Sequence, residues 1–277
     1  MKDFRIVPAY DVPIAEQARV FTEAFAGYVA GSFQFNPTTL ATFLSAQGID
    51  LCYSRFVCDG DGRLISFGFI NRTGEISRLG AMGTIAAGRR LGAGRFLMSH
   101  LLQEAQNRGD SQMFLEVFEQ NPAAKALYEA HGFKSVTPLH GWRSSTNKPE
   151  SDNDTVREIP MSEALRLPHR VDYPEMPWQI SRHAMVKVAR PRVFRSGDIA
   201  AIIGDPKTSP ARFYGYLGFT GQNWDELRRL TQSLLAKFSG TQFFAPQIFP
   251  EEFGSKIFAP LNFQKEPLNQ FLMRKDL

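Results

Sequence analysis

The sequence predicts a mixed α/β or α+β fold, built as one domain followed by a second, related domain. Three observations predict it. Apolar runs of strand length alternate with helical patterns along residues 4–139. A polar segment that is poor in large apolar side chains, 144–155, interrupts the pattern. Strand and helix patterns then return in the same order. We therefore expect domains at 1–150 and 151–277.

The first domain begins with a strand in "FRIVPA" and continues with two stretches of helical apolar spacing, 13–29 and 38–47. Segment 51–70 holds two apolar runs around Asp-Gly-Asp-Gly at 59–62, which is a strong hairpin signal. The next strand, 76–87, contains glycines at which a bulge or a close backbone approach is expected.

Capping signals mark the helices that follow. One helix opens at Gly92, and the strand "QMFLEVFE" comes after it. The next helix has Asn121 as its N-cap, Pro122 at its first position and Gly132 at its end. "FKSVTPL" then resumes the sheet. Mixed strands and helices in this order argue against a helical bundle.

The second half repeats this order with weak identity. "VREIPMSEALRL" is similar to the N-terminal strand and helix, "RVFRSGDIAAIIGD" to the hairpin, and "GTQFFAPQIFPEEFGSKIFAPLNFQKE" to the last strand–helix–strand unit. The last pair aligns without gaps. Its constant offset sets these residues opposite each other: Tyr128 and Phe258, Glu116 and Pro246, Gly92 and Gln222, and Gly94 and Trp224. The second copy keeps apolar positions and loses polar ones, which indicates a domain retained for packing or shape.

Composition excludes several classes. Of 277 residues 43% are hydrophobic and 22% charged, which is enough for a sizeable core, and the net charge of +4 is not clustered as a nucleic-acid binder requires. The N-terminus lacks the apolar segment of a signal peptide, and no apolar run is long enough to span a membrane. Two cysteines, Cys52 and Cys58, and five histidines show no metal-ligand spacing. We expect a cytoplasmic protein without a metal.

Two segments carry a family resemblance. Arg89-Arg90-Leu91-Gly92-Ala93-Gly94 fits an Arg/Gln-x-x-Gly-x-Gly/Ala loop between a strand and a helix, and "NPAAKALYEAHGF", 121–133, fits N-x-x-A-x-x-L-Y-x-x-x-G-F. Together, and in this order, they resemble the GNAT superfamily of acetyl-CoA-dependent N-acyltransferases. The resemblance implies a mostly antiparallel central sheet flanked by helices. It is specific over about residues 75–135.

The glycine-rich loop suits a pyrophosphate. Backbone N–H groups at the start of a helix form an anion site, and glycines let the backbone approach the phosphate oxygens. The alternative is that the glycines only turn the chain and the arginines are solvated. The resemblance further implies that pantetheine pairs with 83–85 and that an N–H there polarises the thioester. The expected acetyl-CoA ligands are Gly83, Thr84, Ile85, Arg89, Arg90, Leu91, Gly92, Ala93, Gly94, Arg95 and Asn121.

The resemblance implies that Tyr128 protonates the departing thiolate; the alternative is an aromatic side chain that packs in the core. Glu116 is the first candidate for the base. Glu119, acting through water, and Glu75 are further candidates, although a strand carboxylate can simply face solvent. Tyr28, with its neighbour Phe25, lines the acceptor pocket or packs in the core.

These features predict a two-domain N-acetyltransferase that transfers acetyl directly to a primary amine in a ternary complex. The alternative is a non-catalytic acyl-CoA-binding sensor or partner-binding module. The acceptor stays open between a polyamine-like amine, an aminoglycoside, an amino acid and a protein N-terminus. A longer acyl donor and a homodimer also stay open. Neither nucleic acid nor membrane is an expected partner.

Overall fold

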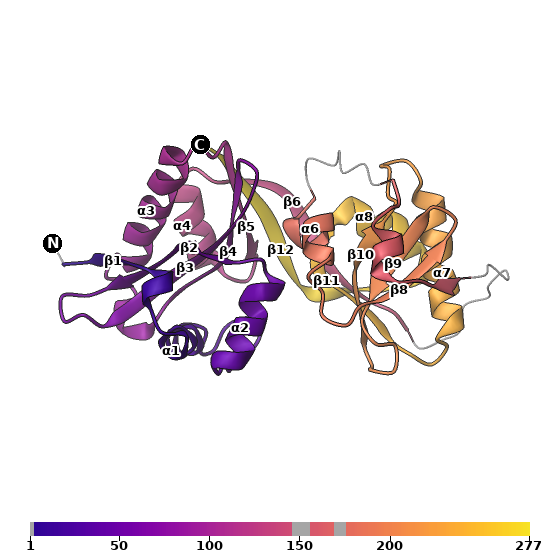
Figure 1. Cartoon of the computed structure of the whole chain (residues 1–277), viewed down its shortest axis with the longest axis horizontal. Coiled ribbons are helices and arrows are strands. Elements are labelled where there is room, and N and C mark those ends of the chain that lie inside the picture. Colours follow the sequence, from indigo (N-terminus) through magenta and orange to yellow (C-terminus); the bar gives the residue numbers. More distant parts are fainter. Residues whose placement is uncertain (1–2, 146–155, 169–175) are drawn as a thin grey trace. The chain divides into compact units, whose positions relative to one another are not determined.

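The computed structural model describes residues 3–145, 156–168 and 176–277, which form two compact units (Figure 1). Unit 1 comprises 1–136 and 271–277, and unit 2 comprises 137–270. Most of the polar segment 144–155 lies outside the described residues, so its expected role as a linker is not tested.

Unit 1 is a mixed sheet between two pairs of helices. Its strands lie in the order β1-β2-β3-β4-β5-β12, and α1 and α2 cover one face while α3 and α4 cover the other (Figure 1). Neighbouring strands from β1 to β4 are antiparallel, whereas β4 and β5 are parallel. The bounds are β1 Arg5–Pro8, α1 Ile14–Ala24, α2 Pro37–Ala46, β2 Asp50–Cys58, β3 Leu64–Thr73, β4 Ile76–Thr84, α3 Ala93–Asn107, β5 Gln112–Phe118 and α4 Pro122–Ala130.

Unit 2 repeats this arrangement, as the sequence predicts. Its strands lie in the order β6-β11-β10-β9-β8-β7, and β10 and β11 are parallel as β4 and β5 are. Phe258, which stands opposite Tyr128 in the alignment, is fully buried against Phe249 and Phe263. The bounds are β7 Arg157–Glu158, α5 Met161–Ala164, α6 Arg182–Met185, β8 Arg192–Ser196, β9 Ile199–Ile203, β10 Ala211–Leu217, α7 Trp224–Lys237, β11 Phe243–Pro250 and α8 Glu251–Ile257.

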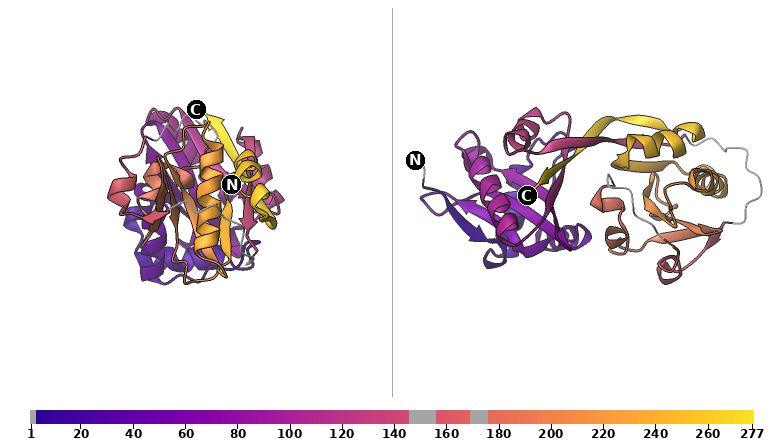
Figure 2. Two further views of the ribbon diagram at one scale, coloured as in Figure 1. Left: turned by 90° about the vertical axis from the view of Figure 1, so that its right-hand side faces the viewer. Right: turned by 90° about the horizontal axis from the view of Figure 1, so that it is seen from above.

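Two strands belong to both units. β6, Lys134–Arg143, begins in unit 1 and ends in unit 2, whereas β12, Gln264–Asp276, begins in unit 2 and ends in unit 1. Their unit 2 portions lie side by side (Figures 1 and 2) and are joined by the Arg143–Glu266 ion pair. The units therefore divide at 136/137 and again at 270/271 rather than at 150/151.

An aromatic cluster fixes α1 on the sheet of unit 1. Phe21 of α1 stacks on Phe67 of β3, with ring centroids 4.9 Å apart, and both side chains are almost fully buried. This contact holds the C-terminal end of α1 against β4. A Cβ on Gly83 of β4 would lie only 2.9 Å from the Cβ of Ala24. Glycine at this position thus permits the close approach of helix and strand.

The paired half of β4 and β5 is secured by a buried carboxylate. Asp110 accepts hydrogen bonds from Ser77, from Arg72 at 2.6 Å and from Arg108 at 2.6 Å, and its side chain has no exposed surface. Burial alone would raise the pKa of the Asp110 carboxyl, but these three donors together hold that pKa below its ordinary value. The network joins β3 and β4 to the segment between α3 and β5.

Replacing Asp110 by asparagine is expected to lower the free energy of unfolding by about 2 kcal/mol, because charge-assisted bonds are lost among buried groups. Because the folded pKa is lowered, the carboxylate contributes stability above the unfolded pKa and loses it as pH falls through the folded pKa. The free energies of unfolding of wild type and Asp110→Asn, measured in urea, should therefore differ at pH 7 and become similar in acid. The control is Asp61→Asn in an exposed turn. Equal stability at pH 7 would contradict this role.

The structure also bears on membrane insertion. Among the residues that it describes, no helix combines the length and the apolar character needed to cross a bilayer.

Candidate active site

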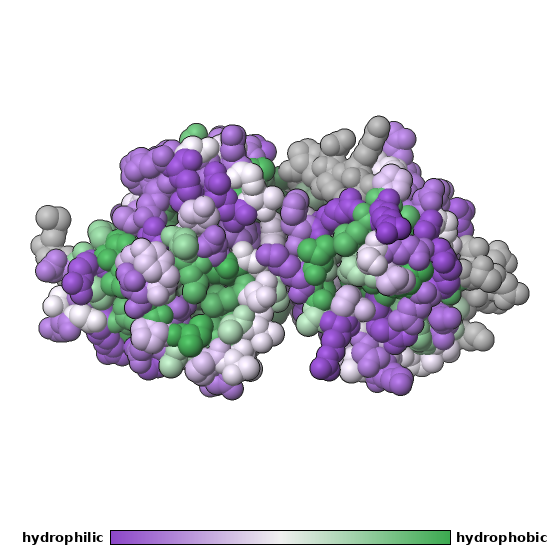
Figure 3. All heavy atoms as spheres, viewed as in Figure 1, coloured by the Kyte–Doolittle hydropathy of each residue, from purple (hydrophilic) through white to green (hydrophobic). Residues whose placement is uncertain are grey.

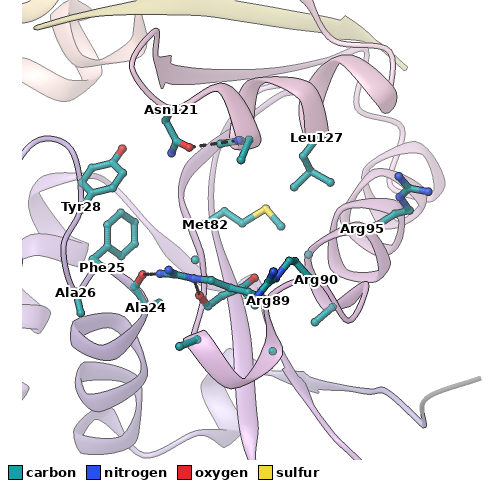
Figure 4. Close-up of a pocket in the computed structure, with 18 of the residues that line it drawn as sticks. Ala24, Phe25, Ala26, Tyr28, Met82, Arg89, Arg90, Arg95, Asn121 and Leu127 are labelled. Carbon is teal, nitrogen blue, oxygen red and sulfur yellow. Dashed lines mark hydrogen bonds between the residues drawn. The ribbon is translucent and has the colours of Figure 1, made fainter.

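A cavity of about 830 Å³ opens in unit 1 between the end of α1, the second half of β4, and the first turns of α3 and α4 (Figure 4). In the view of Figure 3, apolar side chains of unit 1 gather in the band between the two pairs of helices. The cavity brings together the glycine-rich loop, Asn121 and Tyr128, which lie far apart in the sequence.

The start of α3 forms one end of the cavity. Gly92 is its N-cap with a φ of 94°, which is a left-handed conformation that favours glycine, and no side chain among the described residues caps it. The first bond of the helix runs from the Phe96 N–H to the Gly92 carbonyl, so the N–H groups of 93–95 have no acceptor within the helix. Unsatisfied N–H groups and the helix dipole make this end an anion site.

Three arginines lie in the sequence close to the start of this helix. Arg89, Arg90 and Arg95 all line the cavity. Arg90 adopts a left-handed φ of 59°, and neither it nor Arg95 has a hydrogen bond or ion pair among the described residues. Arg89 differs, because its guanidinium already donates to two backbone carbonyls. Arg90, Arg95 and the helix N-terminus thus place positive charge, unpaired among the described residues, at this end of the cavity, which is the chemistry that an anionic ligand requires.

β4 and β5 separate beside the loop. They pair only from Ile76 to Leu79, so the remainder of β4 has no partner on that side. On the other side the Ile85 N–H donates to the Ile65 carbonyl at 2.9 Å. Because backbone direction alternates along an antiparallel pair, the N–H groups of Met82 and Thr84 face the cavity.

Because of this alternation, the backbone groups of two expected ligands face β3 rather than the cavity. Ile85 is fully buried, its N–H is bonded to β3, and it does not line the cavity. Gly83 lines the cavity, but its backbone faces β3 and its carbonyl also accepts from Ser66 at 2.9 Å. Met82 lines the cavity as well, and its backbone faces away from β3. The sequence motif does not single it out, because only the register of β4 against β3 shows which amides are turned outward.

α4 contributes Asn121 and Tyr128. Asn121 caps the helix by accepting from the Ala124 N–H at 3.3 Å, and it lines the cavity, as does Leu127 (Figure 4). Tyr128 is 7% exposed, its ring contacts Phe133, and its hydroxyl has no hydrogen-bond partner among the described residues. Burial raises the pKa of Tyr128 well above its ordinary value, and the nearby Tyr28 adds to the effect. Tyr128 therefore keeps its proton.

The segment after α1 forms the opposite wall. The helix ends at Ala24, earlier than the predicted stretch 13–29, and residues 24–29 line the cavity. Both expected aromatic residues, Phe25 and Tyr28, belong to this wall and contact each other with centroids 4.7 Å apart. Burial raises the pKa of Tyr28 to about 12.

The expected carboxylates do not reach the cavity. Glu119 and Glu75 lie in exposed turns rather than on strands, and Glu75 precedes β4 at the end remote from the cavity. Glu116 is buried in a bidentate ion pair with Arg78, with a shortest distance of 2.6 Å between Nη2 and Oε2. Among the described lining residues there is no Asp, Glu or His. The structure thus gives no support for a base at Glu116.

Glu116→Gln is expected to lower the free energy of unfolding by about 3 kcal/mol, because it leaves the Arg78 charge buried beside a neutral amide. The double change Arg78→Met and Glu116→Met should recover most of that loss, since it removes both charges. Chemical denaturation of both variants measures the difference. If the folded double variant lost kcat more than about a hundredfold, Glu116 would be a general base after all.

The sequence of this chain is similar to one protein family and to curated bacterial enzymes. The model of the "Acetyltransferase (GNAT) family" matches residues 22–133. The [ribosomal protein bS18]-alanine N-acetyltransferase of Escherichia coli K12 is 32% identical over 126 residues, which are 46% of this chain and 82% of that protein. The corresponding enzyme of Salmonella typhimurium is 30% identical over 137 residues, 50% of this chain and 84% of that protein.

Solved structures resemble both units together. A tandem GNAT protein from the clavulanic acid biosynthesis pathway has a TM-score of 0.62 at 13% identity and covers 100% of this chain and 98% of its own. A GCN5-related N-acetyltransferase from Sphaerobacter thermophilus has a TM-score of 0.63 at 14% identity, covering 99% of this chain and 95% of its own. At these identities the likeness concerns the fold.

Proposed function

The chain belongs to the GNAT family of acetyl-CoA-dependent N-acetyltransferases, and from that premise we propose which of its residues bind the donor, aid the transfer and select the acceptor. Unit 1 is the catalytic domain in this proposal, and unit 2 is the degenerate copy. The observation that carries it is the single cavity that joins an uncapped helix N-terminus to Tyr128.

The charges and the free backbone groups along the cavity support acetyl-CoA as its ligand. The N–H groups of 93–95, with Arg90 and Arg95, would hold the pyrophosphate. Leu91, which the motif also predicts as a ligand, does not line this cavity and is exposed. The unpaired edge of β4 would hold the pantetheine amides through Met82 and Thr84. When bound, acetyl-CoA supplies the thioester whose acyl carbon the amine attacks and whose thiolate leaves.

The chain's own groups would assist that transfer directly, without a covalent enzyme intermediate. An N–H of Met82 or Thr84 polarises the carbonyl, because these amides face the cavity and have no strand partner. Tyr128 donates its proton to the sulfur as the C–S bond breaks, the attacking nitrogen releases one proton to solvent, and Tyr128 takes a proton back from solvent. Its raised pKa keeps the phenol protonated, so it is a donor at every physiological pH.

We propose that the acceptor is the α-amine of a protein or peptide N-terminus. The E. coli relative is named for an alanine of ribosomal protein bS18, and this chain's cavity has no acidic lining among its described residues that would attract a polyamine or aminoglycoside. An α-amine has a pKa of about 8, against about 10.4 for lysine, so it loses its proton near neutral pH without a strong base.

The test compares three acceptors: a peptide with a free N-terminus, the same peptide Nα-acetylated but carrying one lysine, and spermidine. We expect acetylation of the first alone, with kcat/KM rising about tenfold per pH unit below the pKa of its α-amine and then levelling. Because the pKa of Tyr128 is raised, the rate should not fall again by pH 10. Acetylation of spermidine alone would overturn the acceptor proposal while leaving acetyl transfer intact.

A further inference from the structure

Arg89 spans the cavity from one wall to the other. Its Nε donates to the Thr84 carbonyl at 3.1 Å, and its Nη2 donates to the Ala24 carbonyl at 2.9 Å (Figure 4). The first acceptor is the last residue of β4 and the second is the last residue of α1. Arg90 and Arg95 line the same cavity but have no such partners among the described residues.

The Ala24 carbonyl is a favourable acceptor for a cation. Carbonyls in the last turn of a helix lack intrahelical donors, and they lie at the negative end of the helix dipole. No basic side chain of α1 itself occupies its last turn, so Arg89 supplies the charge from another element. A guanidinium also suits the task, since its planar fork can bond two carbonyls at once.

The chain that follows Ala24 is the wall of the cavity opposite α4. Phe25 is held independently, because it stacks on Phe21 at 4.6 Å between ring centroids and meets Phe33 at 5.4 Å. Tyr28 makes edge contacts to Phe25 at 4.7 Å and to Phe118 at 5.9 Å, and a looser contact to Phe33 at 6.3 Å between ring centroids. The Arg89 side chain thus links the wall 25–29 to β4, because it donates one hydrogen bond to the Ala24 carbonyl and another to the Thr84 carbonyl.

We infer that Arg89 is a positioning residue that fastens the wall 25–29 to β4 and so shapes the acceptor side of the cavity. It is not a phosphate ligand like Arg90 and Arg95. The inference rests on the proposed function for the identity of donor and acceptor, but the contact that it describes exists without either of them. The loop motif suggests that Arg89 binds phosphate, whereas its two hydrogen bonds favour a positioning role.

Hydrogen exchange of the ligand-free protein tests the contact itself. In Arg89→Ala, amide exchange in peptides covering 25–31 should rise about tenfold, as expected for the loss of hydrogen bonds to a charged donor. Arg90→Ala is the matched control and should leave exchange there unchanged. Arg89→Lys should give an intermediate value, because an ammonium cannot bridge both carbonyls in the same geometry.

Binding and kinetics then separate the two possible roles of the side chain. Arg89→Ala should raise KM for the peptide amine about tenfold while Kd for CoA stays within about twofold, whereas Arg90→Ala should weaken CoA. If Arg89→Ala weakened CoA as Arg90→Ala does and left exchange unchanged, Arg89 would be a phosphate ligand and the inference would be overturned. If the wild type bound no CoA, the proposed function would fail, and the exchange data would still decide whether the contact holds the wall.

Discussion

Gly92→Asp combined with Gly94→Asp is expected to abolish acetyl-CoA binding, measured by isothermal titration calorimetry on the folded protein. Aspartate at 92 would have to adopt the φ of 94° that glycine has there, and both carboxylates would lie beside the N–H groups meant for phosphate. Losing two charge-assisted hydrogen bonds corresponds to about 3 kcal/mol, or a Kd at least about a hundredfold higher.

The matched control for this change is Gly109→Asp. Gly109 also has a positive φ, 81°, and follows the other end of α3, with no atom within 4 Å of the position that a Cβ would take. It therefore carries comparable backbone strain and one added carboxylate, against two in the double variant, without touching the cavity. Equal CoA affinity in wild type and the Gly92/Gly94 variant would rule out phosphate binding at this helix.

Tyr128→Phe is expected to lower kcat about a hundredfold to a thousandfold and to leave Kd for CoA unchanged, because it removes only the proton donor. The ring packs against Phe133, and phenylalanine keeps that contact. Since the hydroxyl has no hydrogen-bond partner among the described residues, the variant loses no bond and its unfolding free energy should not fall. Steady-state kinetics and calorimetry measure the two quantities.

Tyr28→Phe is the matched control, because Tyr28 is a half-buried phenol that lines the same cavity. We expect it to change KM for the amine more than kcat. If Tyr128→Phe retained full kcat, the proton would have to reach the sulfur from another donor, and the role assigned to Tyr128 would be wrong.

The sequence predicts the local features of unit 1 well, because they depend on neighbouring residues. The caps at Gly92 and Asn121 and the hairpin around Asp59–Gly62 follow from torsional preferences and side-chain hydrogen bonds within a few positions. The repeated order of strands is likewise visible in the apolar pattern, and the structure confirms it in unit 2.

The features that the sequence misses depend on residues far apart in the chain. Glu116 meets Arg78, 38 positions away, and this pairing withdraws it from the cavity. The direction of the β4 amides depends on register with β3, which turns the amides of Gly83 and Ile85 toward β3 and those of Met82 and Thr84 toward the cavity. The division of the units was misplaced for the same reason, since no local signal shows that a terminal strand returns to the first unit.

The position of this last strand affects when unit 1 can complete its folding during translation. Residues 271–277 complete the sheet of unit 1 beside β5, where the Leu277 N–H donates to the Ser111 carbonyl at 3.0 Å. During translation, domains usually fold in order as they leave the ribosome, but here the cavity-bearing unit lacks one strand until all of unit 2 has been synthesised. A nascent or prematurely terminated chain would thus present an open sheet edge, so full activity should appear only after unit 2 has been made.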